Sequence, residues 1–366
     1  MKLIVFAYSQ LGHDCLKLLL KREENVVSVF THLDSPSEHI WFDSVAMLAK
    51  QHQIPVFTPE KPNTPEIIET IQNLKPDLIL SFYYRQMIPQ SILDIPSFGA
   101  LNMHGSCLPY YRGRCPVNWA ILHGEKKTGA TLHYMVKAAD AGDIVDQEEV
   151  EITPTDSAGQ VMAKVNEAAQ IVLTRQIQNL KEGNAPRIPQ DHSKASYFGG
   201  RGPKDSEINW TQSALQIHNL IRALQPYPQY PPAFSTLDGK ALWMMRSEVP
   251  ETVKYPLAKP GEITAVNFVQ NAPLNPALLS SDLTLSSSDL TLSSSDLTLS
   301  SSDLFRGSRD SRNKCENDNT SFSVEIACGN GSERIRITKV AMKNTPHQSA
   351  ANDLEIGMIF QCQSEL

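Results

Sequence analysis

The sequence predicts an α/β fold: a Rossmann-like, mostly parallel sheet with helices on both faces, followed by a small, OB-like C-terminal β-barrel. Three observations predict it. Apolar strand-like runs alternate with helical patterns over the first half of the chain. A polar stretch with prolines and glycines follows at residues 182–204, and short strand patterns come after it. The chain has 366 residues, which is enough for two domains.

In chain order, the first half contains four apolar runs of strand length. These lie at residues 3–8, 26–30, 78–82 and 101–103. Apolar residues at helical spacing predict helices between and after them, at residues 11–19, 45–48, 67–74 and 158–181. We therefore expect a catalytic-type α/β domain over residues 1–190 and a linker at 191–205.

The remaining residues, 206–366, form the second predicted domain. One helix is expected at 214–224, and strands at 241–245, 263–266, 323–327 and 335–341. Within this domain the unit Ser-Ser-Ser-Asp-Leu-Thr-Leu recurs every seven residues. Ser, Thr and Asp compete with a helical backbone for hydrogen bonds, so we predict a disordered loop at about 272–320 rather than a coiled coil. A small β-solenoid is the less favoured alternative.

Composition narrows the class of protein. The net charge of −7 argues against a nucleic-acid partner, because phosphate binding needs a clustered basic surface. The six cysteines include no C-x-x-C pair, so we expect no metal site and no disulfide framework. No signal peptide and no apolar segment of membrane-spanning length is evident. These features predict a cytoplasmic enzyme without membrane insertion.

Polar side chains mark the end of the predicted strand at 101–103. Asn102 and His104 alternate with Met103, so both point to one face, and Asp140 follows 36 residues after His104. The strand ends of a parallel sheet are where ligands bind, yet neither G-x-G-x-x-G nor a Walker motif is present. An amide, an imidazole and a carboxylate suit oxyanion stabilisation and proton transfer in acyl transfer. The alternative is a strand end with a buried His and a turn Asp. Spacing leaves open whether His104 or Asp140 takes the proton.

Four linked motifs carry a resemblance to a known family. They are Asn-x-His at 102–104, Leu-Pro-x-x-Arg-Gly at 108–113, Thr-Gly-Ala-Thr at 128–131 and Asp-Ala-Gly-Asp at 140–143. In this order and spacing they resemble the formyltransferases that use 10-formyltetrahydrofolate. The resemblance implies that 10-formyltetrahydrofolate is the co-substrate and that Asn102, His104 and Asp140 are catalytic. It also implies co-substrate contacts from six residues: Gln86, Met87, Ile88, Ala141, Gly142 and Asp143.

Within this family the chain looks closest to the sugar-nucleotide branch, and to the domain that formylates UDP-4-amino-4-deoxy-L-arabinose. The segments 30–34, 81–85 and 112–119 carry this likeness. It implies a nucleotide-linked amino sugar (UDP- or dTDP-linked) as substrate, for cell-envelope polysaccharide or lipid A modification. The substrate-binding residues expected on this basis are Tyr8, Tyr83, Tyr84, Arg85, Arg112 and Arg114. An insertion at 229–232 and the serine-rich repeat depart from the family pattern.

Two other functions remain as alternatives. A methionyl-tRNA formyltransferase must dock a polyanion, but residues 251–366 contain 10 Lys and Arg against 14 Asp and Glu, a net of −4. A folate-binding homologue without activity is disfavoured because all three polar residues are present. The sequence leaves the oligomeric state open, a homodimer included.

Overall fold

The computed structural model describes residues 1–35, 40–225, 232–237, 240–249, 258–260, 262–270, 320–329, 331, 333–342 and 345–349. The chain divides into two units, one of Met1–Val266 with Val324–Leu366 and one of Asn267–Ser323. The serine-rich repeat lies outside the described residues, so the disordered loop predicted at 272–320 stays a prediction apart from Thr320, which begins a strand.

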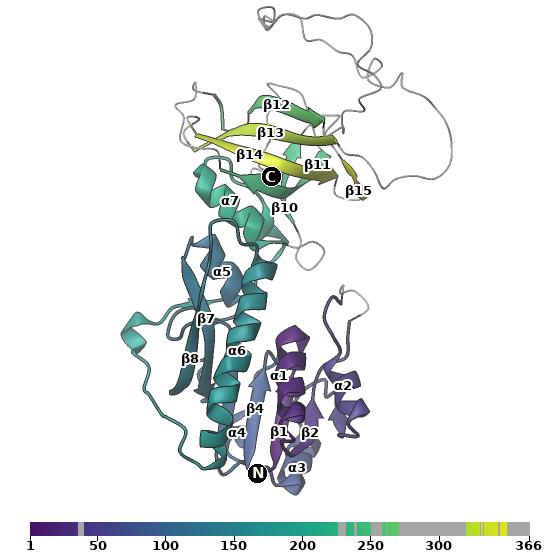
Figure 1. Cartoon of the computed structure of the whole chain (residues 1–366), viewed down its shortest axis with the longest axis vertical. Coiled ribbons are helices and arrows are strands. Elements are labelled where there is room, and N and C mark those ends of the chain that lie inside the picture. The colour runs from purple at the N-terminus through teal and green to yellow at the C-terminus, as the bar shows by residue number, and fades with distance from the viewer. Residues whose placement is uncertain are drawn as a thin grey trace, which may run out of the picture. The chain divides into compact units, whose positions relative to one another are not determined.

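A seven-stranded sheet organises the first half of the chain (Figure 1), in the order β3-β2-β1-β4-β5-β7-β8. Its strands are β1 (Leu3–Ala7), β2 (Val26–Phe30), β3 (Val56–Phe57), β4 (Leu78–Phe82), β5 (Ala100–His104), β7 (Lys127–Tyr134) and β8 (Ile144–Glu151). The first five strands in that order are parallel, whereas β7 and β8 are antiparallel to their neighbours. The mostly parallel sheet is therefore confirmed.

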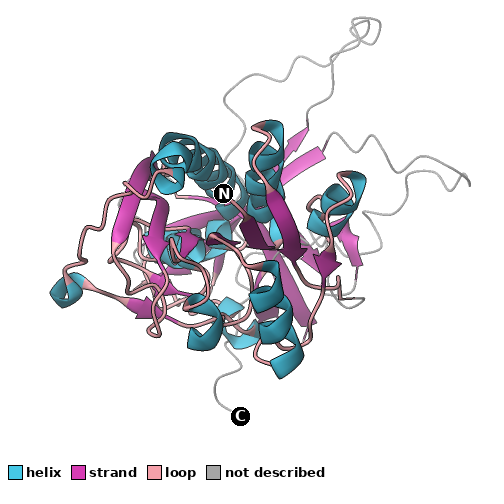
Figure 2. Cartoon of the chain, turned by 90° about the horizontal axis from the view of Figure 1, so that it is seen from below, coloured by secondary structure: helices cyan, strands magenta, loops and turns pink. Residues whose placement is uncertain are grey.

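Helices cover both faces of this sheet (Figure 2). They are α1 (Ser9–Lys21), α2 (Val45–Gln51), α3 (Pro65–Leu74), α4 (Gln90–Leu93), α5 (Pro116–Leu122) and α6 (Ala158–Lys181). On one face α1, α2, α5 and α6 pack on Leu3, Val5 and their neighbours; on the other, α3 and α4 pack on Ile4 and Phe6. The apolar runs read as strands from the sequence are buried on both sides, as expected for parallel strands between helix layers.

The long helix α6 begins where local chemistry sets its start. Ser157 accepts a hydrogen bond from the Gln160 amide, and the Gln160 side chain accepts one from the Ser157 amide. This capping box satisfies two N–H groups that a helix start otherwise leaves unpaired. The observed bounds of α6 coincide with the helix predicted at 158–181.

Several short elements between residues 105 and 206 were not predicted from the sequence. Strand β6 (Arg112–Gly113) pairs in parallel with β9 (Tyr197–Phe198). Two 3-10 helices, η1 (His192–Lys194) and η2 (Pro203–Ser206), lie in the segment predicted as a linker. This segment therefore hydrogen-bonds to the loop after β5, a contact that a linker reading does not anticipate. The domain boundaries themselves stay a prediction.

After this segment comes helix α7 (Ala214–Ala223), followed by strands that form a small antiparallel sheet. They are β10 (Ala233–Leu237), β11 (Lys240–Glu248), β12 (Ile263–Gln270), β13 (Thr320–Cys328), β14 (Glu333–Met342) and β15 (Thr345–Ser349). Antiparallel strands in the second domain agree with the sequence, while closure into a barrel stays a prediction. Among the described residues, none of the helices has the length and apolar character needed to cross a membrane.

Candidate active site

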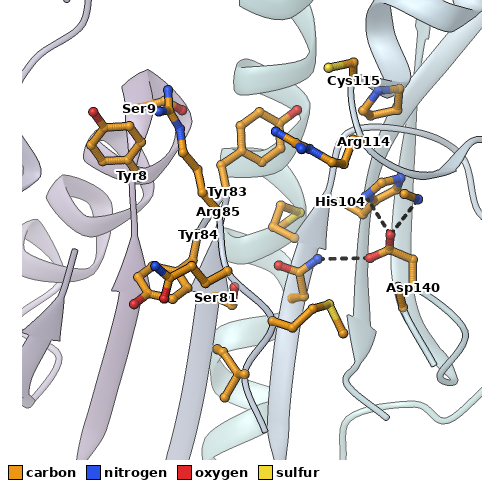
Figure 3. Close-up of a pocket in the computed structure, with 18 of the residues that line it drawn as sticks. Tyr8, Ser9, Ser81, Tyr83, Tyr84, Arg85, His104, Arg114, Cys115 and Asp140 are labelled. Carbon is orange, nitrogen blue, oxygen red and sulfur yellow. Dashed lines mark hydrogen bonds and ion pairs between the residues drawn. The ribbon is translucent and has the colours of Figure 1, made fainter. Parts of the chain in front are cut away.

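A cavity of about 490 Å³ opens where the parallel strands end. Tyr8 follows β1, the segment from Tyr83 to Ile88 follows β4, and Asn102 and His104 end β5. Figure 3 shows Tyr8, Tyr84 and Arg85 on one side of this cavity, with His104 and Asp140 on the other. Its size is in the range of small-molecule sites, and its place is where an α/β sheet binds ligands.

The structure brings Asn102, His104 and Asp140 together at the wall of the cavity. The Asn102 side-chain amide donates to Oδ1 of Asp140 over 3.4 Å, and Nδ1 of His104 lies 3.6 Å from Oδ2 of the same carboxylate. All three line the cavity, and His104 is only 5% exposed. The structure therefore brings the predicted amide, imidazole and carboxylate into contact, as the dashed lines to Asp140 in Figure 3 mark.

The hydrogen bonds of His104 fix its tautomer. Its Nε2 lies 2.8 Å from the carbonyl oxygen of Tyr111, which can only accept, so Nε2 carries the hydrogen. Burial lowers the pKa of His104, against the opposing charge of Asp140, so the ring is neutral at neutral pH. Its Nδ1 then presents a lone pair toward Asp140, in position to accept a proton.

Asp140 is held ionised by its surroundings. Burial opposes ionisation, but His104, His133 and the Gly113 amide together hold the pKa of the Asp140 carboxyl well below its usual range. Asp140 adopts a left-handed backbone with φ of 53°. Its turn also needs a glycine at 142, where an added Cβ would lie 2.0 Å from the carbonyl oxygen of Tyr134.

His133 also belongs to this cluster, although it was not among the site residues expected from the sequence. It lies opposite Asn102 in the β5–β7 pairing, and its Nε2 lies 3.3 Å from the Asn102 amide nitrogen and 3.4 Å from Oδ1 of Asp140. Its Nδ1 donates to the carbonyl oxygen of Tyr134. Nε2 is therefore free to accept one N–H of Asn102. The signal that could have found it was the strand pattern around His133, had the antiparallel pairing with residues 100–104 been foreseen.

Three residues that line the other side of the cavity each carry a side-chain atom without a hydrogen-bond partner. Within the described residues, Ser9 Oγ, Tyr84 Oη and Gln86 Oε1 are buried and have no hydrogen-bond partner. Burial raises the pKa of Tyr84 to about 12, so its hydroxyl keeps its proton and can donate.

Arg85 also stands at this side of the cavity. Its guanidinium lies over the ring of Tyr8, 4.5 Å from the centroid, and its amide donates to Nε2 of His32. His32 does not line the cavity but stacks on Tyr84. It acts as a support for the residues that do.

The predicted binding residues divide into two groups. Those that line the cavity are Tyr8, Tyr83, Tyr84, Arg85, Gln86, Met87, Ile88 and Arg114. Those that do not line it are Ala141, Gly142, Asp143 and Arg112. Arg112 is 1% exposed and its guanidinium bonds to Gln190 and Tyr197, so the structure does not bring it to a substrate. Guanidinium chemistry alone suggested a ligand contact, whereas burial makes it a structural group. No cluster of three metal-ligating side chains is found among the described residues.

Comparisons with known proteins agree with this architecture. A family model described as formyl transferase matches residues 1–177, and one described as formyl transferase, C-terminal domain, matches residues 202–270. Among solved structures, the sugar 3N-formyl transferase WlaRD, solved with dTDP and 5-N-formyl-THF, is 17% identical with a TM-score of 0.60, covering 94% of this chain and 98% of its own.

Two further structures are similar. An N-formyltransferase from Helicobacter canadensis, in complex with folinic acid and dTDP-3-aminofucose, is 18% identical with a TM-score of 0.59, covering 92% of this chain and 99% of its own. A 4-N formyltransferase from Francisella tularensis is 24% identical with a TM-score of 0.53, covering 64% of this chain and 91% of its own. At these identities the likeness establishes a shared fold.

Proposed function

The chain belongs to the formyl transferase family, and we propose that it transfers a formyl group from 10-formyltetrahydrofolate to the amino group of a nucleotide-linked amino sugar. The observation that carries this proposal is the convergence of Asn102, His104 and Asp140 on one cavity wall. The rest of the cavity lining includes aromatic rings and two arginines for the two substrates.

The reaction begins when a neutral amine attacks the formyl carbon and a negative charge develops on the formyl oxygen. Asn102 is the donor for that oxygen. One of its N–H groups faces Nε2 of His133, which orients the amide, and the other makes only a 3.4 Å bond to Asp140. We propose that this N–H exchanges its long bond to Asp140 for a bond to the developing oxyanion. A hydrogen bond to a charged oxyanion in the right position is shorter and stronger than this 3.4 Å contact.

The attacking amine must then lose a proton. Nδ1 of His104 is the acceptor, because Nε2 already donates to Tyr111 and because burial keeps the ring neutral. Once protonated, Nδ1 faces Oδ2 of Asp140 and forms an ion pair with it. The imidazolium can return its proton to the departing folate nitrogen. No covalent enzyme intermediate is needed, and burial raises the pKa of the nearby Cys107 thiol to about 11, which disfavours it as a nucleophile.

The substrate class follows from the cavity and from the similar structures. Arg85 and Arg114 line the cavity and can pair with a diphosphate. Two of the similar structures were solved with dTDP or with dTDP-3-aminofucose. For this chain we propose a UDP- or dTDP-linked amino sugar, with UDP-4-amino-4-deoxy-L-arabinose as the first candidate because of segments 81–85 and 112–119.

The test is a formyl-transfer assay with purified protein and 10-formyltetrahydrofolate. The acceptors are UDP-4-amino-4-deoxy-L-arabinose, dTDP-linked 3-amino and 4-amino sugars, and methionyl initiator tRNA, with products identified by mass spectrometry. We expect a formylated sugar nucleotide, no product on tRNA, and product formation slowed on the order of a hundredfold or more in the His104→Ala variant. Formylation of the tRNA alone, or no product on any amino sugar, would overturn the proposal.

A further inference from the structure

A glutamine outside the cavity connects the Asp140 turn to the loop that follows β5. The Gln190 side-chain nitrogen donates to the carbonyl oxygens of Asp140 over 2.9 Å and of Gly142 over 2.6 Å. Its side-chain oxygen accepts from the Arg112 guanidinium, over 3.2 Å from Nε and 2.6 Å from Nη2. Gln190 is buried, so all four contacts are shielded from water. The side-chain amide of Gln190 therefore links the Asp140 turn to the loop that follows β5.

Arg112 is an unusual cation. It is 1% exposed, and the other contacts of its guanidinium are the Tyr197 hydroxyl, which accepts from Nη1, and Nδ1 of His192. Within the described part of the chain its hydrogen bonds thus go only to neutral groups. Burying a cation without a carboxylate partner lowers the free energy of unfolding, so the buried Arg112 needs a reason other than stability.

Arg112 immediately precedes a residue that hydrogen-bonds to Asp140, and this position gives a reason for its burial. The next residue, Gly113, donates its main-chain N–H to Oδ2 of Asp140 over 2.9 Å. Pairing of β6 with β9 fixes the main chain here, since the Arg112 amide donates to the Ser196 carbonyl. Gln190 is fixed in turn by a two-way main-chain bridge between Ile144 and Ile188. Asp140 is therefore held twice, by its carbonyl through Gln190 and by its carboxylate through Gly113.

We infer that Gln190 is a positioning residue for Asp140, with Arg112 as its anchor: together they hold the left-handed Asp140 turn so that the carboxylate faces His104. This inference rests on the proposed function. Neither residue lines the cavity, so neither acts on substrate directly. Arg112, predicted from the sequence to bind substrate, is reassigned to this role.

Two substitutions separate the ends of the Gln190 amide. Gln190→Glu keeps an acceptor for Arg112, so the buried cation stays paired, but it puts an oxygen against the carbonyls of Asp140 and Gly142. Gln190→Met removes donor and acceptor without adding charge. Gln147→Met is the matched control, because the Gln147 amide also donates twice, to Leu108 O and Thr131 Oγ1, but does not touch the Asp140 turn.

We expect Gln190→Glu and Gln190→Met to lower kcat roughly tenfold to a hundredfold with KM changed less than about threefold, because positioning acts on the reacting geometry. The control should lose thermal stability by a similar amount to Gln190→Met but keep its kcat. Unchanged kcat in Gln190→Glu, or an equal loss of kcat in Gln147→Met, would overturn the inference.

A titration of His104 by NMR tests the same inference without any substrate. Its imidazole signal is assigned by its loss in His104→Gln, and Asp140→Asn gives the titration midpoint without the carboxylate charge. If Asp140 swings away, Gln190→Met should lower the His104 midpoint toward the Asp140→Asn value, by about half a pH unit or more. A midpoint equal to wild type would overturn the inference. If wild type formylates no amino sugar, the proposed function fails, while this titration still decides whether Gln190 positions Asp140.

Discussion

The Gly113 amide donates a 2.9 Å hydrogen bond to Oδ2 of Asp140, the carboxylate oxygen that also faces Nδ1 of His104. An amide donor favours the charged form of a carboxylate, so this bond keeps Asp140 ionised in a buried site. It also leaves the carboxylate too acidic to take the amine proton itself. The question that the spacing of His104 and Asp140 left open thereby gains a proposed answer, with His104 as the base and Asp140 as its partner.

The first prediction concerns the residues nearest the reacting carbon. Asn102→Ala removes the oxyanion donor and His104→Ala removes the proton acceptor, so each should lower kcat on the order of a hundredfold or more. Far-UV circular dichroism should be unchanged, because both side chains stand at the cavity wall. A rate near wild type in either variant would remove that residue from the mechanism.

The second prediction concerns stability against pH. Burial lowers the pKa of His104, despite Asp140, and His133 and Arg112 also face it. The unfolded chain therefore binds a proton at pH values where the folded protein does not. The free energy of unfolding should then fall as the pH drops below about 6.5, by at most about 1.4 kcal/mol per pH unit for this one group.

Urea unfolding of wild type and His104→Gln at pH 7.5 and 5.5 measures this dependence. The loss of stability between the two pH values should be smaller in the variant. His218, whose pKa burial also lowers, provides a second source of the same slope, and His218→Gln accounts for it separately. Equal slopes in wild type and His104→Gln would contradict the prediction.

The third prediction concerns the loop that carries the Gly113 amide. Gly113 has φ of 98°, and an added Cβ would lie 2.3 Å from the carbonyl oxygen of Phe198. Gly113→Ala should therefore displace the loop, costing about 2 kcal/mol or more of stability and most of the activity. Gly199→Ala is the control, because nothing lies within 4 Å of its added Cβ. Thermal melts and kcat measurements on both variants test this prediction. Equal losses of melting temperature and kcat in Gly113→Ala and Gly199→Ala would contradict it.

The fourth prediction compares two arginines. Arg222 is buried and donates to Asn219 Oδ1 and to the carbonyls of Thr153 and Asp156. Arg222→Met leaves these acceptors unpaired and should cost roughly 3 kcal/mol or more. Arg175→Met breaks ion pairs with Asp146 and Glu148, but Arg175 is 43% exposed and the change should cost about 1 kcal/mol or less. Denaturant unfolding measures both, and a larger cost at Arg175 would reverse the argument.

The sequence predicted the parts of the fold in which local pattern and final environment agree. Residues 3–7, 26–30 and 78–82 are apolar apart from Ser28 and Ser81, because both faces of these strands are covered. Helix α6 was predicted to the residue because its apolar stripe is long. The β7–β8 hairpin was missed, since β8 is largely polar on its exposed face and carries little apolar signal.

The sequence predicted those residues of the candidate site that follow from the alternation of side chains along one strand. Asn102 and His104 share a face of β5, and strand geometry alone requires that. His133 and Gln190 were missed because their partners lie 31 and 50 residues away along the chain. Arg112 was assigned to substrate because it lies in the segment 112–119 that resembles the sugar-nucleotide branch, and only the fold could reveal its burial. Long-range pairing, rather than composition, decides these cases.

Among the residues that the structure describes, the side chains that line the cavity come from residues 8–162, and the segment holding the Asp140 turn ends before α7 begins. The chemistry is therefore specified by little more than half of the polypeptide. A change confined to the later half of the sequence, such as the length of the serine-rich repeat, leaves the residues that line the cavity themselves unaltered.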